Sequence, residues 1–103
     1  MIKVTVLYPN SGGAKFNMDY YVTKHMPTVR QRLGAVCKGV AVDQGVAGGT
    51  PDSPPSFIAM GHLLFDSVDA FRKAFAPHAE ELMADVANYT SIEPLILISE
   101  VKM

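Results

Sequence analysis

The sequence predicts a single α+β domain in which four strands and two helices follow one another in the order β-α-β-β-α-β. Four segments show the apolar alternation or the continuous apolar run of a β-strand, and two segments show apolar residues at helical spacing. The length of 103 residues also suits one domain. Residues 1–103 are therefore expected to fold as one unit, because neither half would form a core alone.

The first strand is expected over Ile2 to Tyr8. Alternate side chains along it would point to opposite faces of a sheet. One face would carry Ile2, Val4, Val6 and Tyr8, and the other Lys3, Thr5 and Leu7. The turn-forming residues 9–13 end this strand.

The first helix is expected between Asn17, which suits an N-cap, and Gly34, which suits the position after a helix. Its apolar residues recur at spacings of three and four: Met18, Val22, Met26, Val29 and Leu33. Pro27 lies inside this helix and removes a backbone donor, at a cost of about 3 kcal/mol in a regular interior. The sequence therefore predicts a kink between Thr23 and Met26.

The second and third strands are expected over residues 35–46 and 56–65, on either side of a turn-rich loop over 48–55 that we expect to be mobile. Both faces of the third strand are apolar, which is typical of a strand covered on two sides. On one of these faces, Ala59 and Gly61 leave room for a close helix or for a ligand.

The second helix is expected after Asp66 and Ser67, which can cap it. Pro77 would interrupt it and start a fresh helical segment. The last strand is expected over residues 92–101 and is again apolar on both faces.

This order of elements is that of the ferredoxin-like βαββαβ unit with an antiparallel sheet. Right-handed crossovers would place both helices on one face of the sheet. The other face would then meet water, although the third and fourth strands are apolar there. We therefore expect a homodimer in which a second copy covers that face.

Charge and cysteine content limit the possible partners and location. Nine basic and ten acidic residues nearly cancel and form no basic stripe, which argues against nucleic acid and against an anionic membrane. No apolar run approaches the roughly 20 residues of a membrane span. Cys37 is the single cysteine, so no intrachain disulfide can form and a cytoplasmic location is expected.

The three histidines, His25, His62 and His78, do not share metal-ligand spacing, so no metal site is predicted. No cofactor is predicted either, and hydrolase, glycosidase and dehydrogenase functions have little support, because their motifs are missing. His78 should face solvent. His62 lies on the third strand and should be buried and hydrogen-bonded in the core or at the dimer interface, or else line a pocket.

Tyr21 and His25 are the candidate catalytic residues. They lie four positions apart and are therefore neighbours on one helix face. An imidazole titrates near neutral pH, and a phenol beside it can donate or accept a hydrogen bond, so the pair could move a proton. The alternative is that His25 is a histidine with satisfied hydrogen bonds at the rim of the core.

Several segments of the chain resemble the EthD family, whose name comes from a protein linked to the degradation of ethyl tert-butyl ether. The matching residues are Tyr8-Pro9-Asn10, Phe16, Asp19-Tyr20-Tyr21, Lys24-His25-Met26-Pro27, Leu33-Gly34, Asn88 to Pro94, and Ile98 to Val101. The resemblance implies a dimeric α/β barrel built from ferredoxin-like subunits. Proteins of this barrel class often act without a cofactor as isomerases, cyclases, dehydratases or monooxygenases on small hydrophobic molecules.

Three functions remain open on the sequence. The first is a cofactor-free enzyme of a catabolic or secondary-metabolite pathway, with His25 as general base or acid and a tyrosine stabilising the oxyanion. The second is a non-catalytic carrier of small hydrophobic or aromatic molecules, and the third a structural dimer whose cleft is filled by its own side chains. The expected substrate-binding residues are Tyr8, Tyr20, Ala59, Gly61 and His62.

Overall fold

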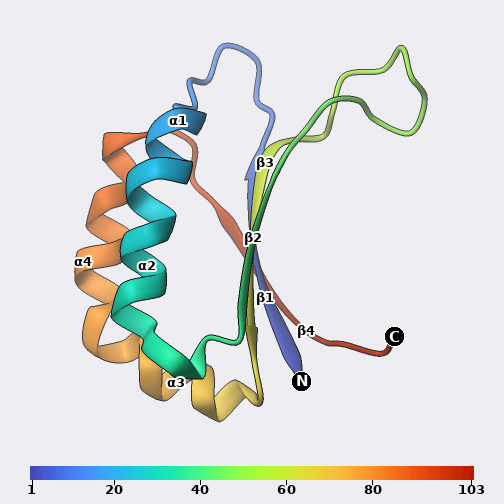
Figure 1. Ribbon diagram of the computed structural model, residues 1–103. Coiled ribbons are helices and arrows are strands. Elements are labelled where there is room, and N and C mark those ends of the chain that lie inside the picture. Colours follow the sequence, from blue (N-terminus) through green and yellow to red (C-terminus); the bar gives the residue numbers. More distant parts are fainter.

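The computed structural model describes all of residues 1–103 (Figure 1). The strands are β1 (Ile2–Pro9), β2 (Gly39–Gln44), β3 (Phe57–Phe65) and β4 (Leu95–Glu100). The α-helices are α1 (Met18–Tyr20), α2 (Met26–Leu33), α3 (Val68–Phe75) and α4 (Ala79–Ala84). A π-helical turn, η1 (Tyr21–His25), and three 3₁₀ turns, η2 (Gly34–Val36), η3 (Ala76–His78) and η4 (Asp85–Asn88), join or extend the helices.

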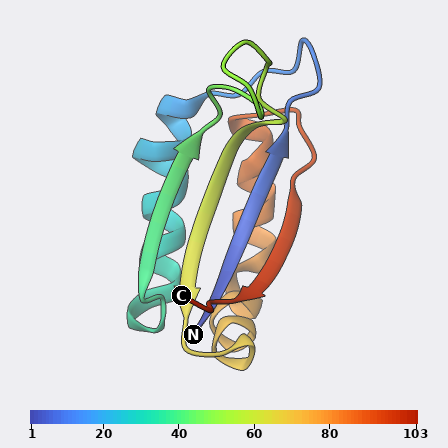
Figure 2. The same ribbon diagram turned by 90° about the vertical axis from the view of Figure 1, so that its right-hand side faces the viewer.

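The four strands form one antiparallel sheet in the order β2-β3-β1-β4. Figure 1 shows both helical regions on one side of this sheet, and Figure 2 shows the uncovered face from the front. The predicted ferredoxin-like α+β fold is therefore confirmed. No helix in it combines the length and the apolar character that crossing a membrane requires.

The first helical region is irregular where Pro27 disturbs it. The side chain of Asn17 accepts a hydrogen bond from the Tyr20 backbone N–H, as the sequence predicts. The distortion takes the form of the wide π turn η1, in which the Met26 N–H reaches back to the Tyr21 carbonyl. The hydroxyl of Thr28 donates to the Lys24 carbonyl at 2.8 Å and helps to satisfy the loosened backbone. Gly34 ends the helix with a φ of 72°, a conformation that favours glycine.

Two predicted strands are shorter than expected. Residues 35–38 do not join β2, because the Cys37 N–H bonds back to the Gly34 carbonyl and closes the turn η2. Residues 92–94 do not join β4. Ile92 is instead buried in the core, and Pro94 has no N–H to give to the sheet.

The second helical region begins at the expected cap, where the Ser67 side chain accepts from the Ala70 N–H at 3.1 Å. Pro77 interrupts it within the turn η3, and α4 and η4 then continue to Asn88. The loop between β2 and β3 projects from the body of the molecule on the side away from the helices (Figure 1). Its mobility stays a prediction.

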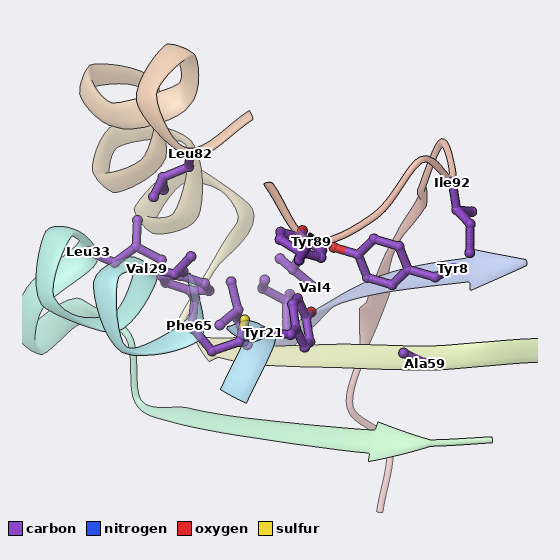
Figure 3. Close-up of a cluster of buried hydrophobic side chains, with 13 residues drawn as sticks. Val4, Tyr8, Tyr21, Val29, Leu33, Ala59, Phe65, Leu82, Tyr89 and Ile92 are labelled. Atoms are coloured by element: carbon purple, nitrogen blue, oxygen red, sulfur yellow. Dashed lines mark hydrogen bonds between the residues drawn. The ribbon is translucent and has the colours of Figure 1, made fainter. Parts of the chain in front are cut away.

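The hydrophobic core lies between the helices and the sheet (Figure 3). Ala59 and Phe65 on β3 are fully buried there. The opposite face of the sheet has no cover within one chain, and Leu95 and Leu97 of β4 are 54% and 55% exposed. Ile96, on the helix side of β4, is also 54% exposed, because the helices cover this edge strand only in part.

Candidate active site

An aromatic cluster occupies one end of the core. Tyr8 comes from β1, Tyr21 from the turn η1, and Tyr89 follows η4 (Figure 3). His25, at the end of the same turn η1, packs against these rings. The ring centroids of His25 and Tyr89 lie 4.7 Å apart, and those of Tyr21 and His25 lie 5.5 Å apart with nearly parallel planes. Three separate parts of the chain therefore meet around one imidazole.

A partly enclosed cavity of about 80 Å³ lies against this cluster, between the sheet and the helices. Fourteen of its seventeen lining residues are hydrophobic. The lining consists of Val4, Val6, Tyr8, Tyr21, His25, Met26, Val29, Gly61, Leu63, Phe71, Phe75, Leu82, Met83, Val86, Tyr89, Pro94 and Ile96. The few polar groups of this wall are thus the histidine and the tyrosines, which is the usual pattern of a site for a small organic molecule.

The imidazole of His25 has a partner at each nitrogen. Its Nδ1 lies 2.8 Å from Oδ2 of Asp85, and its Nε2 lies 3.5 Å from the hydroxyl of Tyr89. An ionised carboxylate can only accept hydrogen bonds, so Nδ1 carries the proton and donates a hydrogen bond to Asp85. The lone pair of a neutral ring is therefore on Nε2, the nitrogen that points toward Tyr89.

Asp85 holds this ring from outside the cavity. Its carboxylate also accepts hydrogen bonds from the Tyr20 hydroxyl at 2.7 Å and from the Asn88 amide at 2.8 Å. Burial by itself would raise the pKa of Asp85, but the hydrogen bonds from Asn88, His25 and Tyr20 outweigh it and lower the pKa below its usual value. The carboxylate stays charged and keeps the imidazole in one tautomer and one orientation.

The three phenols beside the cavity stay protonated. The Tyr8 and Tyr89 hydroxyls are 2.6 Å apart and buried. Burial is the main reason why the pKa values of Tyr8, Tyr21 and Tyr89 are raised well above that of a free phenol. These hydroxyls can donate hydrogen bonds but cannot act as bases near neutral pH. His25 is the lining group that can accept a proton.

A larger groove of about 700 Å³ runs along the outer side of the helices and includes Asp85 and Asn88 in its wall. It is wide open to solvent, and only three of its twelve lining residues are hydrophobic. We regard the smaller cavity as the candidate site, because it is more enclosed and more apolar than the groove and is lined by the imidazole and the phenols. Asp85 lies between the two spaces.

The structure brings together four of the residues that the sequence singles out: Tyr8, Tyr21, His25 and Gly61 all line the cavity. Ala59 is on the same face of β3 but is fully buried and does not line it. Tyr20 points to Asp85 in the outer groove.

His62 and His78 lie away from the cavity. On the uncovered face of the sheet, Nε2 of His62 lies 2.8 Å from Asp43, and its Nδ1 lies 3.2 Å from Thr5. His78, expected to face solvent, is half-buried in η3. No three His, Cys, Asp or Glu side chains gather where they could hold a metal ion.

Sequence reasoning missed Asp85 and Tyr89. A signal for both was present in the helical spacing, because Leu82, Val86 and Tyr89 form an apolar stripe and Asp85 lies beside it. A carboxylate beside an inward-facing stripe is partly buried and needs hydrogen-bond donors, and His25 is one of them.

A family model described as the EthD domain matches residues 14–93. The chain belongs to the EthD family. It is 33% identical over 92 residues to an uncharacterised 11.0 kDa protein in the thcB-thcC intergenic region of Rhodococcus erythropolis, with 88% of this chain and 85% of that protein covered. The crystal structure of an EthD-like protein from Ralstonia eutropha JMP134 is 44% identical and superposes with a TM-score of 0.95, covering 99% of this chain and 92% of that one.

A more distant structure shares the fold alone. It is a dimeric protein of ferredoxin-like fold from Bacteroides fragilis, 13% identical, with a TM-score of 0.55 over 97% of this EthD chain and 95% of the other.

We predict that Gly61→Ala destabilises the EthD chain by about 1–3 kcal/mol, the usual cost of overpacking a core. A Cβ at position 61 would occupy the space of the Tyr21 hydroxyl, and Tyr21 is only 1% exposed. Urea unfolding measures this loss. Gly49→Ala is the matched control, because a Cβ there meets no other atom. Equal stability of the two variants would show that Tyr21 moves aside freely.

We predict that the stabilising effect of Asp85 disappears in acid. The folded pKa of this carboxyl lies below its ordinary value of 3.8, so folding favours the ionised form. The stabilisation is complete above the ordinary pKa and is lost as the pH falls through the folded value. The difference in melting temperature between the natural chain and Asp85→Asn should therefore shrink as the pH falls from about 6 to about 3. Asp52→Asn, in the exposed loop, should show no such trend, and a constant difference for Asp85→Asn would contradict this account.

Proposed function

We propose that this EthD protein is an enzyme that moves a proton at a carbon next to a carbonyl group in a small hydrophobic molecule. The observation that supports this most is the His25 imidazole, which lines the cavity and has Nε2 toward the Tyr89 hydroxyl of the same wall, while Asp85 holds Nδ1. This is the arrangement of a general base that becomes a general acid in the next step.

In the proposed reaction, the carbonyl oxygen of the substrate accepts a hydrogen bond from a phenol of the cavity wall. Nε2 of His25 then takes a proton from the neighbouring carbon, the C–H electron pair forms a C=C bond, and the carbonyl oxygen becomes an enolate oxygen. The neutral phenols stabilise that oxygen, and Asp85 stabilises the imidazolium. Return of the proton to another carbon gives an isomer. Attack of the enolate on a second carbonyl gives a cyclised product, which can lose water.

We further propose that the protein is a homodimer in which the uncovered sheet faces of two copies pack together. The exposed leucines of β4 support this, since they would otherwise stay in water. The dimeric assembly of the structurally similar Bacteroides fragilis protein is consistent with it. A reducing cytoplasm suits the free thiol of Cys37.

Light scattering should give a mass of about twice the 11.1 kDa of the chain. Leu97→Lys should yield monomers, because it places a charge on an apolar part of the proposed interface. Val22→Lys changes a similarly exposed apolar residue on the helical side and should leave the dimer intact. A natural chain that is monomeric at micromolar concentration would contradict the proposed dimer.

Replacing His25 by Gln should lower turnover by about 10²- to 10⁴-fold, the usual share of a general acid or base. Glutamine has a similar size and can still bond to Asp85, so the fold and the assembly should persist. Turnover of a panel of small carbonyl compounds, measured together with thermal melting, tests this. His78→Gln is the control, since it makes the same chemical change outside the cavity.

The two alternative functions, a non-catalytic carrier and a structural dimer, predict different results for His25→Gln. A carrier would still bind its ligand after His25→Gln, with affinity changed by about one hydrogen bond, or 0.5–1.5 kcal/mol. A purely structural dimer would bind no ligand, and a lower melting temperature would be the main effect. Unchanged turnover in His25→Gln would end the proposal of catalysis.

A further inference from the structure

We propose that the cavity selects uncharged carbonyl compounds and rejects carboxylates. This inference deepens the proposed function by naming the substrate class of the same site. It rests on the charges around the cavity, on the hydrogen-bond donors that face it and on its size.

No lysine or arginine lines the cavity, so a bound carboxylate would have no cation to pair with. His25 does not provide one. Asp85, 2.8 Å from its Nδ1, balances the charge of a protonated ring, and a neutral ring carries no charge at all. A carboxylate in the cavity would leave water for apolar walls and would also be repelled by Asp85. Burying a charge without a partner is strongly unfavourable.

A carbonyl oxygen, in contrast, fits the donors that are present. The hydroxyl of Tyr21 lies over Gly61 in the cavity wall, in the space that a side chain at position 61 would fill. The Tyr8 hydroxyl interacts with both Tyr89 and Tyr21, so the three phenols form one group. Within this group we assign Tyr21 as the donor to a ligand, because its hydroxyl lies over Gly61 in the cavity wall. Phenol donors in otherwise apolar walls match a small molecule that carries a carbonyl oxygen on a hydrocarbon frame.

The volume of the cavity limits the size of the substrate's hydrocarbon frame. Benzene occupies an apolar cavity of about 150 Å³ in another protein, and this cavity of about 80 Å³ is roughly half as large. The cavity therefore suits a small aliphatic carbonyl compound better than an aromatic one. Met83 is 49% exposed and also lines the cavity, so its flexible side chain is the part of the wall best able to yield to a longer substrate.

Butanone and propionate test the inference, because they have the same number of non-hydrogen atoms and differ in charge. Each is titrated into the natural chain while the methyl signals of Val4, Met26 and Val86 are followed by NMR. Butanone should shift these signals saturably, and propionate should not. Tyr21→Phe should weaken butanone binding by about two- to tenfold, the effect of one lost hydrogen bond.

Met83→Lys tests whether charge is the cause. Lysine has a straight side chain like methionine and should be accommodated at the half-exposed position 83, where its ammonium group can pair with a carboxylate. We expect propionate to bind this variant saturably, whereas Met83→Gln, the uncharged control, should still reject it.

The inference and the proposed function can fail separately. Selective butanone binding without any turnover would keep the inference and remove the enzyme. Propionate binding to the natural chain as tightly as butanone, no saturable butanone binding, or no gain of propionate binding in Met83→Lys would overturn the inference, whatever His25 does.

Discussion

A histidine buried between a sheet and a helix layer needs a hydrogen-bond partner at each ring nitrogen, and His25 obtains both from the far end of the chain. Asp85 and Tyr89 lie 60 and 64 positions away in sequence. Their contacts with His25 also join the first helical region to the second at one end of the core. Moving either region would leave a buried imidazole or carboxylate without its partner, at about 1–3 kcal/mol for each group. The geometry of the site and the packing of the helices therefore depend on the same contacts.

The backbone near Pro27 contributes to this geometry. A proline cannot donate to the helix ladder, and the chain responds with the π turn η1 immediately before it. This turn carries both Tyr21 and His25, which stack there above the sheet. Below them, β3 has a glycine at position 61, so the Tyr21 hydroxyl can approach the strand closely. Wide turns of this kind occur often at functional sites, and here the turn directs two polar side chains into an apolar core.

The two faces of the sheet have different chemistry. On the helix side, the sheet and the helices surround an apolar cavity that is lined by neutral phenols and one imidazole. The other side carries exposed leucines together with His62, whose two nitrogens lie close to Asp43 and Thr5 on the neighbouring strands. Because this polar group already has its partners within one chain, covering it in the proposed dimer would leave no nitrogen of the ring unsatisfied. The imidazole of His62 can therefore be covered without losing a hydrogen-bond partner.

The sequence by itself determined the order of elements, the cap at Asn17, the distortion before Pro27 and the close approach at Gly61, because each follows from local spacing or from one residue's backbone chemistry. It also brought Tyr21 and His25 together, since residues four apart share a helix face. Tertiary structure alone decided that Asp85 and Tyr89 complete the site, that Tyr20 turns to the outer groove and that His62 lies on the opposite face from His25. These outcomes depend on how distant segments pack, and local periodicity carries no information about which distant side chain will satisfy a buried polar atom.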